Sequence, residues 1–175
     1  LLGIVLVLGT LSMFILGLID DIWPVGPLIK LLSQIAVASL FIHAGGVFNL
    51  FEYDLLDTLI TYLWFLVIIN SLNMLDNMDG LAIGIASLSM IYLVLISTPP
   101  SGTDPLIIPL GITILAALIA FWLFNYNPAS IFMGDSGSLS IGFILAALTI
   151  PGELNYNFGL IVNTKIENYI FLLIP

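Results

Sequence analysis

Long runs without any acidic or basic side chain restrict the fold of this chain more than any other feature. They cover Leu1–Ile19, Leu81–Gly102 and Leu106–Tyr126. A helix needs about 20 apolar residues to cross the hydrocarbon core of a bilayer, and only helices and closed barrels satisfy every backbone polar group there. Because these runs are continuously apolar rather than alternating, they predict membrane-spanning helices.

The composition excludes a water-soluble domain. Charged residues make up 7% of the chain and hydrophobic residues 61%, whereas about a quarter of the residues of a soluble domain are charged. The formal net charge of −9, with Lys30 and Lys165 as the only basic residues, argues against a nucleic-acid partner, whose phosphates bind Lys and Arg. Without cysteine, the chain offers neither a disulfide framework nor a thiolate metal site.

Seven apolar segments can be drawn, of which the last is incomplete: 1–19, 28–43, 58–72, 81–98, 106–124, 138–151 and 169–175. The expected fold is all-α, a polytopic transmembrane helix bundle with about six complete spans and the start of a seventh. We see no repeat and no second domain, so residues 1–175 are expected to form a single membrane-embedded domain. Since the chain begins with Leu1 and stops at Pro175 inside an apolar run, we interpret it as an internal fragment, truncated at both ends.

The order of the spans predicts that five carboxylates meet at one membrane surface. Two spans separate Asp20 and Asp21 from Asp76 and Asp79, and two more separate these from Asp135. An even number of crossings returns the chain to the same side. The other acids are expected on the opposite surface: Glu52, Asp54, Asp57, Asp104, Glu153 and Glu167. The positive-inside rule does not orient the chain, because its two lysines fall on opposite sides.

The first polar motif is Gly17-Leu-Ile-Asp-Asp-Ile22. Adjacent carboxylates at a membrane border repel each other and are costly to desolvate, which favours a bound cation. Mg²⁺ is the usual ion near phosphate, and a solvated helix end is the alternative. Lys30 and Gln34, four residues apart on one helix face, could bind a phosphate, although Lys30 could equally be a snorkelling interfacial lysine.

In the second motif, polar residues recur every third position: Asn70, Asn73, Asp76 and Asp79. On an ideal helix the first and last of these would lie about 180° apart, so all four can face one cavity only if the helix ends within the series. Gly80 suggests such a break. Amides and carboxylates at a helix end suit nucleotide hydroxyls, base edges or a metal-bound diphosphate. Ordinary helix capping explains one or two of these residues, not four.

The third motif surrounds Asp135 with small residues and reads Asn125-Tyr-Asn-Pro-Ala-Ser-Ile-Phe-Met-Gly-Asp-Ser-Gly-Ser138. Small neighbours let the backbone approach a ligand, and the free N–H groups of a helix that starts here would bind an anion. Asp135 could recruit the metal that neutralises phosphates. As a bare pattern the Gly-Asp-Ser-Gly turn is weak, but it lies on the same side as the other four carboxylates.

Together and in this order, the three motifs resemble those of the polyprenyl-phosphate N-acetylhexosamine 1-phosphate transferases. That family includes undecaprenyl-phosphate GlcNAc-1-phosphate transferases and phospho-MurNAc-pentapeptide translocase. The resemblance extends from about Gly17 to Gly142 and rests on Gly17-Leu-Ile-Asp-Asp21, Asn70-x-x-Asn73-x-x-Asp76-x-x-Asp79-Gly80-Leu-Ala82 and Phe124-Asn-x-x-Pro128-Ala-x-Ile-Phe-Met-Gly-Asp135-x-Gly-Ser138.

The resemblance implies a Mg²⁺-dependent phosphotransferase, with Mn²⁺ as a possible substitute. A polyprenyl phosphate, such as undecaprenyl phosphate, would attack the β-phosphorus of a UDP-sugar and release UMP. By similarity, Asp135 would bind the metal, and Asp20, Asp21 and Lys30 would be the catalytic residues. Asp20 and Asp21 would handle the lipid phosphate and metal, with Asp20 as the favoured base or positioning group, and Lys30 would steady phosphate charge. The nucleotide pocket would be lined by Asn73, Asp76, Asp79, Asn125 and Phe132, with Phe132 stacking on uracil. A direct attack needs only positioning and charge neutralisation and is preferred over a covalent intermediate, which stays open.

The resemblance also implies a bacterial plasma membrane protein whose active site faces the cytoplasm, where UDP-sugars are found. A UDP-GlcNAc donor is favoured because Phe124–Ser138 looks closer to that branch, with UDP-MurNAc-pentapeptide as the alternative and a homodimer left open. Asn77 departs from a common family glycine, and the family's His-rich motif would lie beyond Pro175. An ion-coupled transporter is the rival of another class, but it predicts carboxylates near the bilayer midplane rather than at span ends.

Overall fold

The computed structural model describes residues 1–51, 53–96 and 107–150. These residues form six helices: α1 (Leu2–Ile22), α2 (Pro27–His43), α3 (Asp54–Leu75), α4 (Leu81–Ile96), α5 (Ile107–Asn125) and α6 (Gly134–Leu148). No strand occurs in these ranges. The predicted all-α bundle is therefore confirmed, whereas the seventh apolar segment, 169–175, lies outside the described residues.

The helices have the length and composition of a multi-pass membrane protein. Three stretches are long and apolar enough to cross a bilayer, namely Leu2–Ile22, Asp54–Leu75 and Ile108–Asn125. The other three helices are shorter but apolar. The outward faces agree, because α1 exposes large apolar side chains along its length: Ile4, Val7, Leu8, Leu11, Phe14, Ile15, Leu18 and Ile19. Such a face is compatible with hydrocarbon as the surrounding solvent.

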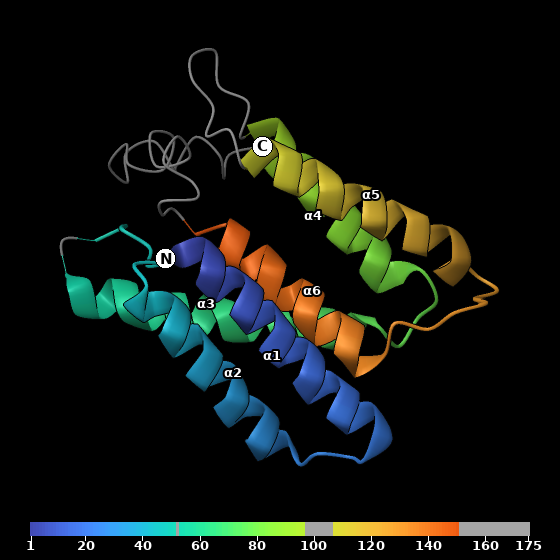
Figure 1. Cartoon of the computed structure of the whole chain (residues 1–175), viewed down its shortest axis with the longest axis horizontal. Coiled ribbons are helices and arrows are strands. Elements are labelled where there is room, and N and C mark those ends of the chain that lie inside the picture. The colour runs from blue at the N-terminus through green and yellow to red at the C-terminus, as the bar shows by residue number, and fades with distance from the viewer. Residues whose placement is uncertain (52, 97–106, 151–175) are drawn as a thin grey trace.

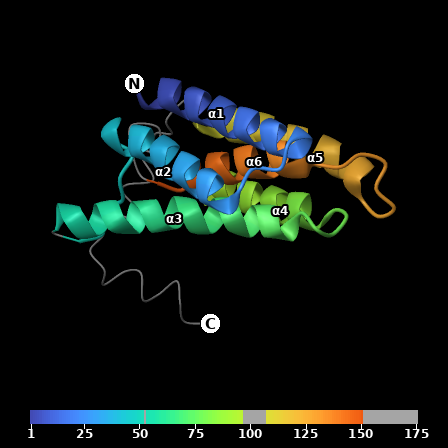
Figure 2. The same cartoon turned by 90° about the horizontal axis from the view of Figure 1, so that it is seen from below.

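Helix α6 lies in the middle of the bundle and contacts α1, α3 and α4 (Figures 1 and 2). Helix α2 packs on α1 and α3, and α5 packs on α4. The core between α2, α3 and α6 holds three fully buried rings, Phe41, Phe65 and Phe143. Their centroids lie 5.3 Å apart for Phe41–Phe65 and for Phe65–Phe143, within the range of favourable aromatic pairs.

Successive helices run in opposite directions, so one end of the bundle collects three helix ends and three helix starts. The ends of α1, α3 and α5 and the starts of α2, α4 and α6 lie toward the right and the lower edge of Figure 1. The same end carries five carboxylates, because of their places at these helix ends and in the α3–α4 connection: Asp20, Asp21, Asp76, Asp79 and Asp135. The expected gathering of these carboxylates on one side is therefore observed.

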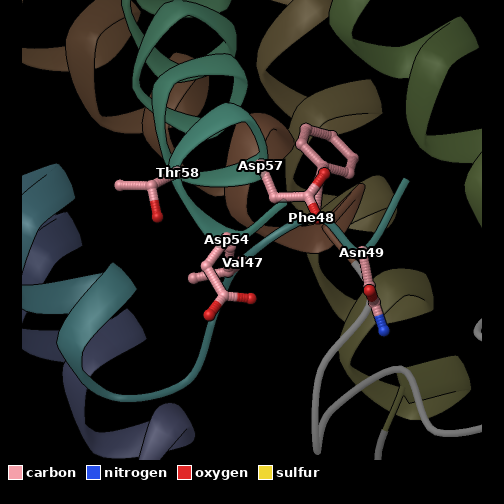
Figure 3. A pocket seen from close by; sticks show the side chains of 6 residues that line it. All are labelled: Val47, Phe48, Asn49, Asp54, Asp57 and Thr58. Carbon is pink, nitrogen blue, oxygen red and sulfur yellow. The ribbon is translucent and has the colours of Figure 1, made fainter. Parts of the chain in front are cut away.

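The opposite end has a cavity of about 380 Å³ beside the start of α3 (Figure 3). Asp57 lines it, is 4% exposed and accepts backbone N–H bonds from Leu50 and Phe51. Thr61, one turn further, accepts the N–H of Phe48 at 3.1 Å. These contacts hold the α2–α3 connection against the first turns of α3, so the acid at this end has a structural role.

Gly142 lets α6 lie directly against α3. A Cβ atom added there would lie 2.8 Å from the Cα of Ile69, closer than real Cβ contacts. We expect Gly142→Ala to lower the free energy of unfolding in detergent by about 1–3 kcal/mol, because the two backbones must separate. Gly84→Ala on α4 is the control, since its Cβ would meet only Trp122 Nε1 at 3.4 Å. Equal loss in the two variants would contradict this account of the α3–α6 contact.

Candidate active site

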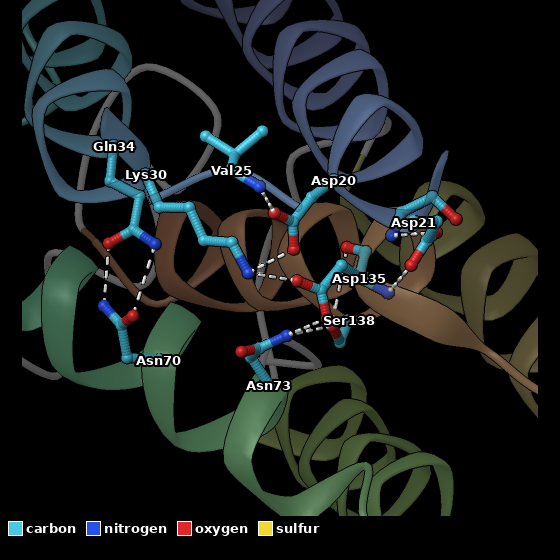
Figure 4. A network of polar contacts seen from close by, with 10 residues as sticks. Asp20, Asp21, Val25, Lys30, Gln34, Asn70, Asn73, Asp135 and Ser138 are labelled. Carbon is cyan, nitrogen blue, oxygen red and sulfur yellow. Dashed lines mark hydrogen bonds and ion pairs between the residues drawn. The ribbon is translucent and has the colours of Figure 1, made fainter. Parts of the chain in front are cut away.

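Lys30 joins two of the carboxylates at the shared end of the bundle (Figure 4). Its ammonium forms ion pairs with Oδ2 of Asp20, in the last turn of α1, and with Oδ2 of Asp135, in the first turn of α6. The three side chains are 22%, 12% and 26% exposed, respectively. The ammonium therefore holds the ends of α1, α2 and α6 together in a largely desolvated place.

The other oxygen of Asp135 is held from α3. Asn73 donates its amide to Asp135 Oδ1 at 2.8 Å and to the Ser138 hydroxyl at 2.9 Å. Asp135 is thus bound on one oxygen by a lysine of α2 and on the other by an amide of α3 (Figure 4). This arrangement orients the carboxylate that the third motif singled out.

Asp21 points away from Lys30 and caps α6. Its carboxylate accepts the backbone N–H of Asp135 at 2.8 Å and of Ser136 at 3.1 Å. Negative charge at a helix N-terminus is favourable because the first N–H groups lack intrahelical partners. The expectation that these amides are free to bind a substrate anion is therefore wrong: a carboxylate of the chain itself occupies them.

Gly134 makes this cap possible. It has a φ of +63°, a left-handed conformation that glycine adopts without steric cost. A Cβ atom there would lie 2.9 Å from Asp21 Oδ2. The Gly-Asp-Ser-Gly pattern thus begins a helix whose first turn accommodates a carboxylate from α1.

Asp76 follows the last residue of α3, so the helix ends within the Asn–Asn–Asp–Asp series as expected. Burial, together with the negative charges of Asp135 and Asp21, raises the pKa of Asp76 to about 6. Three carboxylates therefore face one small region. In the part of the chain that the structure describes, Lys30 is the only lysine or arginine available to balance them.

The remaining predicted residues lie in the neighbouring loops or, for Asn125, at the end of α5. Asp79 accepts the Asn127 amide at 3.2 Å and the Ala129 N–H at 3.1 Å, which ties the α3–α4 loop to the α5–α6 loop. Asn125 is 4% exposed; it accepts the N–H of Gly80 and donates to the carbonyl of Ile131.

The predicted nucleotide-binding residues Asn125 and Phe132 differ in whether their side chains are free to bind a ligand. Both functional atoms of the Asn125 amide are engaged with backbone, so in this structure Asn125 braces the two loops from beneath. Phe132, in contrast, is 76% exposed, which leaves its ring free to stack. The assignment to a nucleotide pocket stays a prediction for all five residues.

Sequence reasoning missed two partners that complete the site and expected a different partner for a third. Ser138 and Asn127 were quoted in the motif without a role, yet they bind Asn73 and Asp79. Gln34, the only glutamine of the chain, was expected to share a phosphate with Lys30. Its amide is instead paired with Asn70. The three-residue polar spacing identified Asn70 as part of a motif, but it did not indicate that Asn70 would contact a residue of α2.

Comparison with known protein families agrees with this geometry. The family model described as glycosyl transferase family 4 matches residues 3–153. The chain belongs to glycosyl transferase family 4. Matched residues include all three polar motifs and all six described helices except the first residue of α1.

Curated relatives come from two groups of the family. A probable undecaprenyl-phosphate N-acetylglucosaminyl 1-phosphate transferase of Bacillus subtilis is 30% identical over 153 residues, which cover 82% of this chain and 42% of the relative. The decaprenyl-phosphate N-acetylglucosaminephosphotransferase of Mycobacterium tuberculosis is 34% identical over 172 residues, 87% of this chain and 42% of the relative.

In the other group, a phospho-N-acetylmuramoyl-pentapeptide-transferase of Latilactobacillus sakei is 40% identical over 93 residues, 53% of this chain and 28% of the relative. The chain therefore spans less than half the length of these relatives. Both groups were named by the resemblance drawn from the three motifs, so that resemblance is confirmed.

The cap on α6 gives a prediction about stability. We expect Asp21→Ala to lower the free energy of unfolding by about 0.5–2 kcal/mol, as for other lost N-caps. Asp21→Asn should lose clearly less, because asparagine keeps one acceptor oxygen and caps helices well. Thermal unfolding in detergent measures both. If Asp21 acted mainly by repelling Asp76 and Asp135, both variants would instead be more stable than the parent.

Proposed function

We propose that the full-length protein transfers an N-acetylhexosamine 1-phosphate, GlcNAc 1-phosphate by preference, from a UDP-sugar to a polyprenyl phosphate and releases UMP. The observation that carries this proposal is the cluster of Lys30, Asp20 and Asp135 at one end of a membrane-spanning bundle. The phosphate of a polyprenyl lipid lies at the membrane surface, where the ends of spanning helices also lie, and a nucleotide sugar reaches that surface from water. The named activities of the relatives support the same reaction class.

Lys30 is proposed to receive the phosphates. An ammonium has three N–H donors, and Asp20 and Asp135 each accept one. The third donor remains for a substrate phosphate oxygen. With Asn73 and Lys30 holding Asp135, the charged groups are oriented before substrate arrives, and such preorganisation lowers the barrier for charge-separating steps.

The chemical step needs no proton transfer if the lipid phosphate is already ionised. One of its oxygens forms a bond to the β-phosphorus of the UDP-sugar, and the bond from that phosphorus to the oxygen bridging it to the α-phosphorus breaks. The bridging oxygen and its electron pair leave with UMP. The task of the protein is then to position two anions and reduce their repulsion, which favours direct attack over a covalent intermediate, with Asp20 as a positioning group.

We propose Mg²⁺ as the cofactor. Mg²⁺ prefers oxygen ligands and is usually bound through one or two carboxylates plus substrate phosphates. The described residues contain no group of three or more acidic, cysteine or histidine side chains that could hold a metal by themselves, but Asp135 and its neighbour Asp20 supply the one or two carboxylates that such a shared site needs. The metal would neutralise charge on the diphosphate.

The loops beside this cluster are proposed to take the nucleotide. Asp79 and the exposed ring of Phe132 lie on the α3–α4 and α5–α6 loops, and Asn125 would act by bracing those loops. Because UDP-sugars are cytosolic, this end of the bundle would face the cytoplasm. UDP-MurNAc-pentapeptide is the second candidate donor, favoured by the 40% identity to the Latilactobacillus sakei relative.

The test is a transfer assay with the full-length protein in detergent, undecaprenyl phosphate, radiolabelled UDP-GlcNAc and Mg²⁺. We expect labelled lipid and UMP, abolished by EDTA, and a loss of about 100-fold or more in Asp135→Asn, since preorganised charge at a reacting centre contributes on that order. Asp54→Asn is the control, because Asp54 lies at the other end of the bundle.

The other possible outcomes distinguish a wrong choice of donor from a wrong reaction class. Product with UDP-MurNAc-pentapeptide, but none with UDP-GlcNAc, would keep the reaction and change the donor. No product with any UDP-sugar, or full activity of Asp135→Asn, would overturn the proposal.

A further inference from the structure

A second polar contact joins α2 and α3 one helical turn deeper in the bundle than Lys30. Asn70 donates its amide to Gln34 Oε1 at 2.7 Å, and Gln34 donates to Asn70 Oδ1 at 3.3 Å (Figure 4). Asn70 also donates to the carbonyl of Leu66 at 2.7 Å. Gln34 is 1% exposed. The two amides therefore satisfy each other, with Gln34 fully buried and Asn70 partly buried.

Such a pair specifies one alignment of two helices. Between membrane helices the hydrophobic effect does not favour one apolar alignment over another, because lipid and side chains are equally apolar, so only packing distinguishes them. The paired amides do favour one alignment, because a shift of α2 along α3 would leave polar groups without partners in hydrocarbon. A single buried polar pair is known to set helix register in this way.

The pair lies next to the groups that hold Asp135. Gln34 follows Lys30 by four residues and Asn70 precedes Asn73 by three, so each is about one turn away on its own helix. Lys30 and Asn73 then bind the two oxygens of Asp135. The amide pair and Asp135 are thus consecutive bridges between α2 and α3. Helix α2 depends more on such polar contacts than α6 does, because the packing contact of α2 with α3 is less extensive than the contacts of α6 with α1 and α3.

We propose that the Gln34–Asn70 amide pair fixes the position of α2 along α3 and thereby holds the Lys30 ammonium between Asp20 and Asp135. Gln34 and Asn70 are positioning residues, and neither touches substrate. Their expected effect on turnover rests on the proposed function, whereas their effect on helix position does not.

The first experiment replaces both amides with leucine, which leaves no unpaired polar group behind. In full-length Gln34→Leu/Asn70→Leu protein we expect kcat to fall about tenfold or more, because small misplacements of a charged group lower the rate strongly. KM for the UDP-sugar should change less than kcat, since the loops proposed to hold the nucleotide are untouched. The exchanged variant Gln34→Asn/Asn70→Gln keeps one long and one short amide and should recover most of the loss.

Tyr62→Phe is the matched control. Tyr62 of α3 and Ser39 of α2 form another polar contact, at 2.8 Å. Ser39 lies nine residues beyond Lys30 along α2 and is therefore distant from the site. Removal of this contact should leave kcat unchanged. An equal loss of kcat in Tyr62→Phe and in the leucine variant would show that any weakened α2–α3 contact suffices, which would overturn a special role for the amide pair.

A second experiment tests whether the effect passes through Lys30. In a Lys30→Ala background, the leucine double substitution should cause no further loss of kcat, because the group that it misplaces is gone. A purely structural role predicts that the two losses multiply, and that result would overturn the proposal.

A third measurement does not depend on turnover. Residues 1–175 contain no cysteine, so once any cysteine elsewhere in the full-length protein is replaced, nitroxide labels can be placed at Leu28 and Met74. These residues are 65% and 73% exposed near the site end of α2 and α3. The distance distribution between the labels should shift or broaden in the leucine variant and stay unchanged in Tyr62→Phe. An unchanged distribution in the leucine variant would refute the inference, even if no UDP-sugar is turned over and the proposed function fails.

Discussion

Polar groups in the interior of a membrane protein must find their partners within the protein, because hydrocarbon offers none. In the residues that the structure describes, no buried side-chain nitrogen or oxygen lacks a hydrogen-bond partner. The partners come from different helices: Lys30 of α2 binds α1 and α6, and Asn73 of α3 binds α6. The same contacts that satisfy polar atoms therefore assemble the end of the bundle, so site and fold cannot be varied independently.

The charge balance of that end is incomplete. Five carboxylates lie at this end, and the ammonium of Lys30 pairs with only two of them, Asp20 and Asp135. Asp79 is held by an amide and a backbone N–H, whereas burial and neighbouring charge raise the pKa of Asp76 to about 6. An anionic substrate approaching this region would add to the repulsion. We therefore expect phosphates to enter together with a divalent cation, which is the electrostatic reason for the proposed Mg²⁺.

Much of the fold could be predicted because runs without charged residues identify the membrane-spanning helices. The number of spans between two acidic residues then predicts whether they lie at the same end of the bundle. Those inferences need only local composition and the direction of successive helices. Distances between helices are a different matter. Helical spacing indicates which face Gln34 or Asn70 occupies, but it does not say which residue lies opposite on another helix. The pairing of Gln34 with Asn70 and the bracing of loops by Asn125 depend on that tertiary alignment, which no local pattern contains.

The adjacent acids Asp20 and Asp21 show this limit most clearly. As neighbours in the sequence they suggest one cation site, but consecutive residues of a helix point about 100° apart. Asp20 faces α2 and pairs with Lys30, while Asp21 faces the first turn of α6. The cation of Asp20 is an ammonium, and the positive partner of Asp21 is a helix N-terminus, which carries roughly half a unit charge. Repulsion within the pair is thus relieved by two different helices, and the motif serves to bring α2 and α6 to the same end of α1.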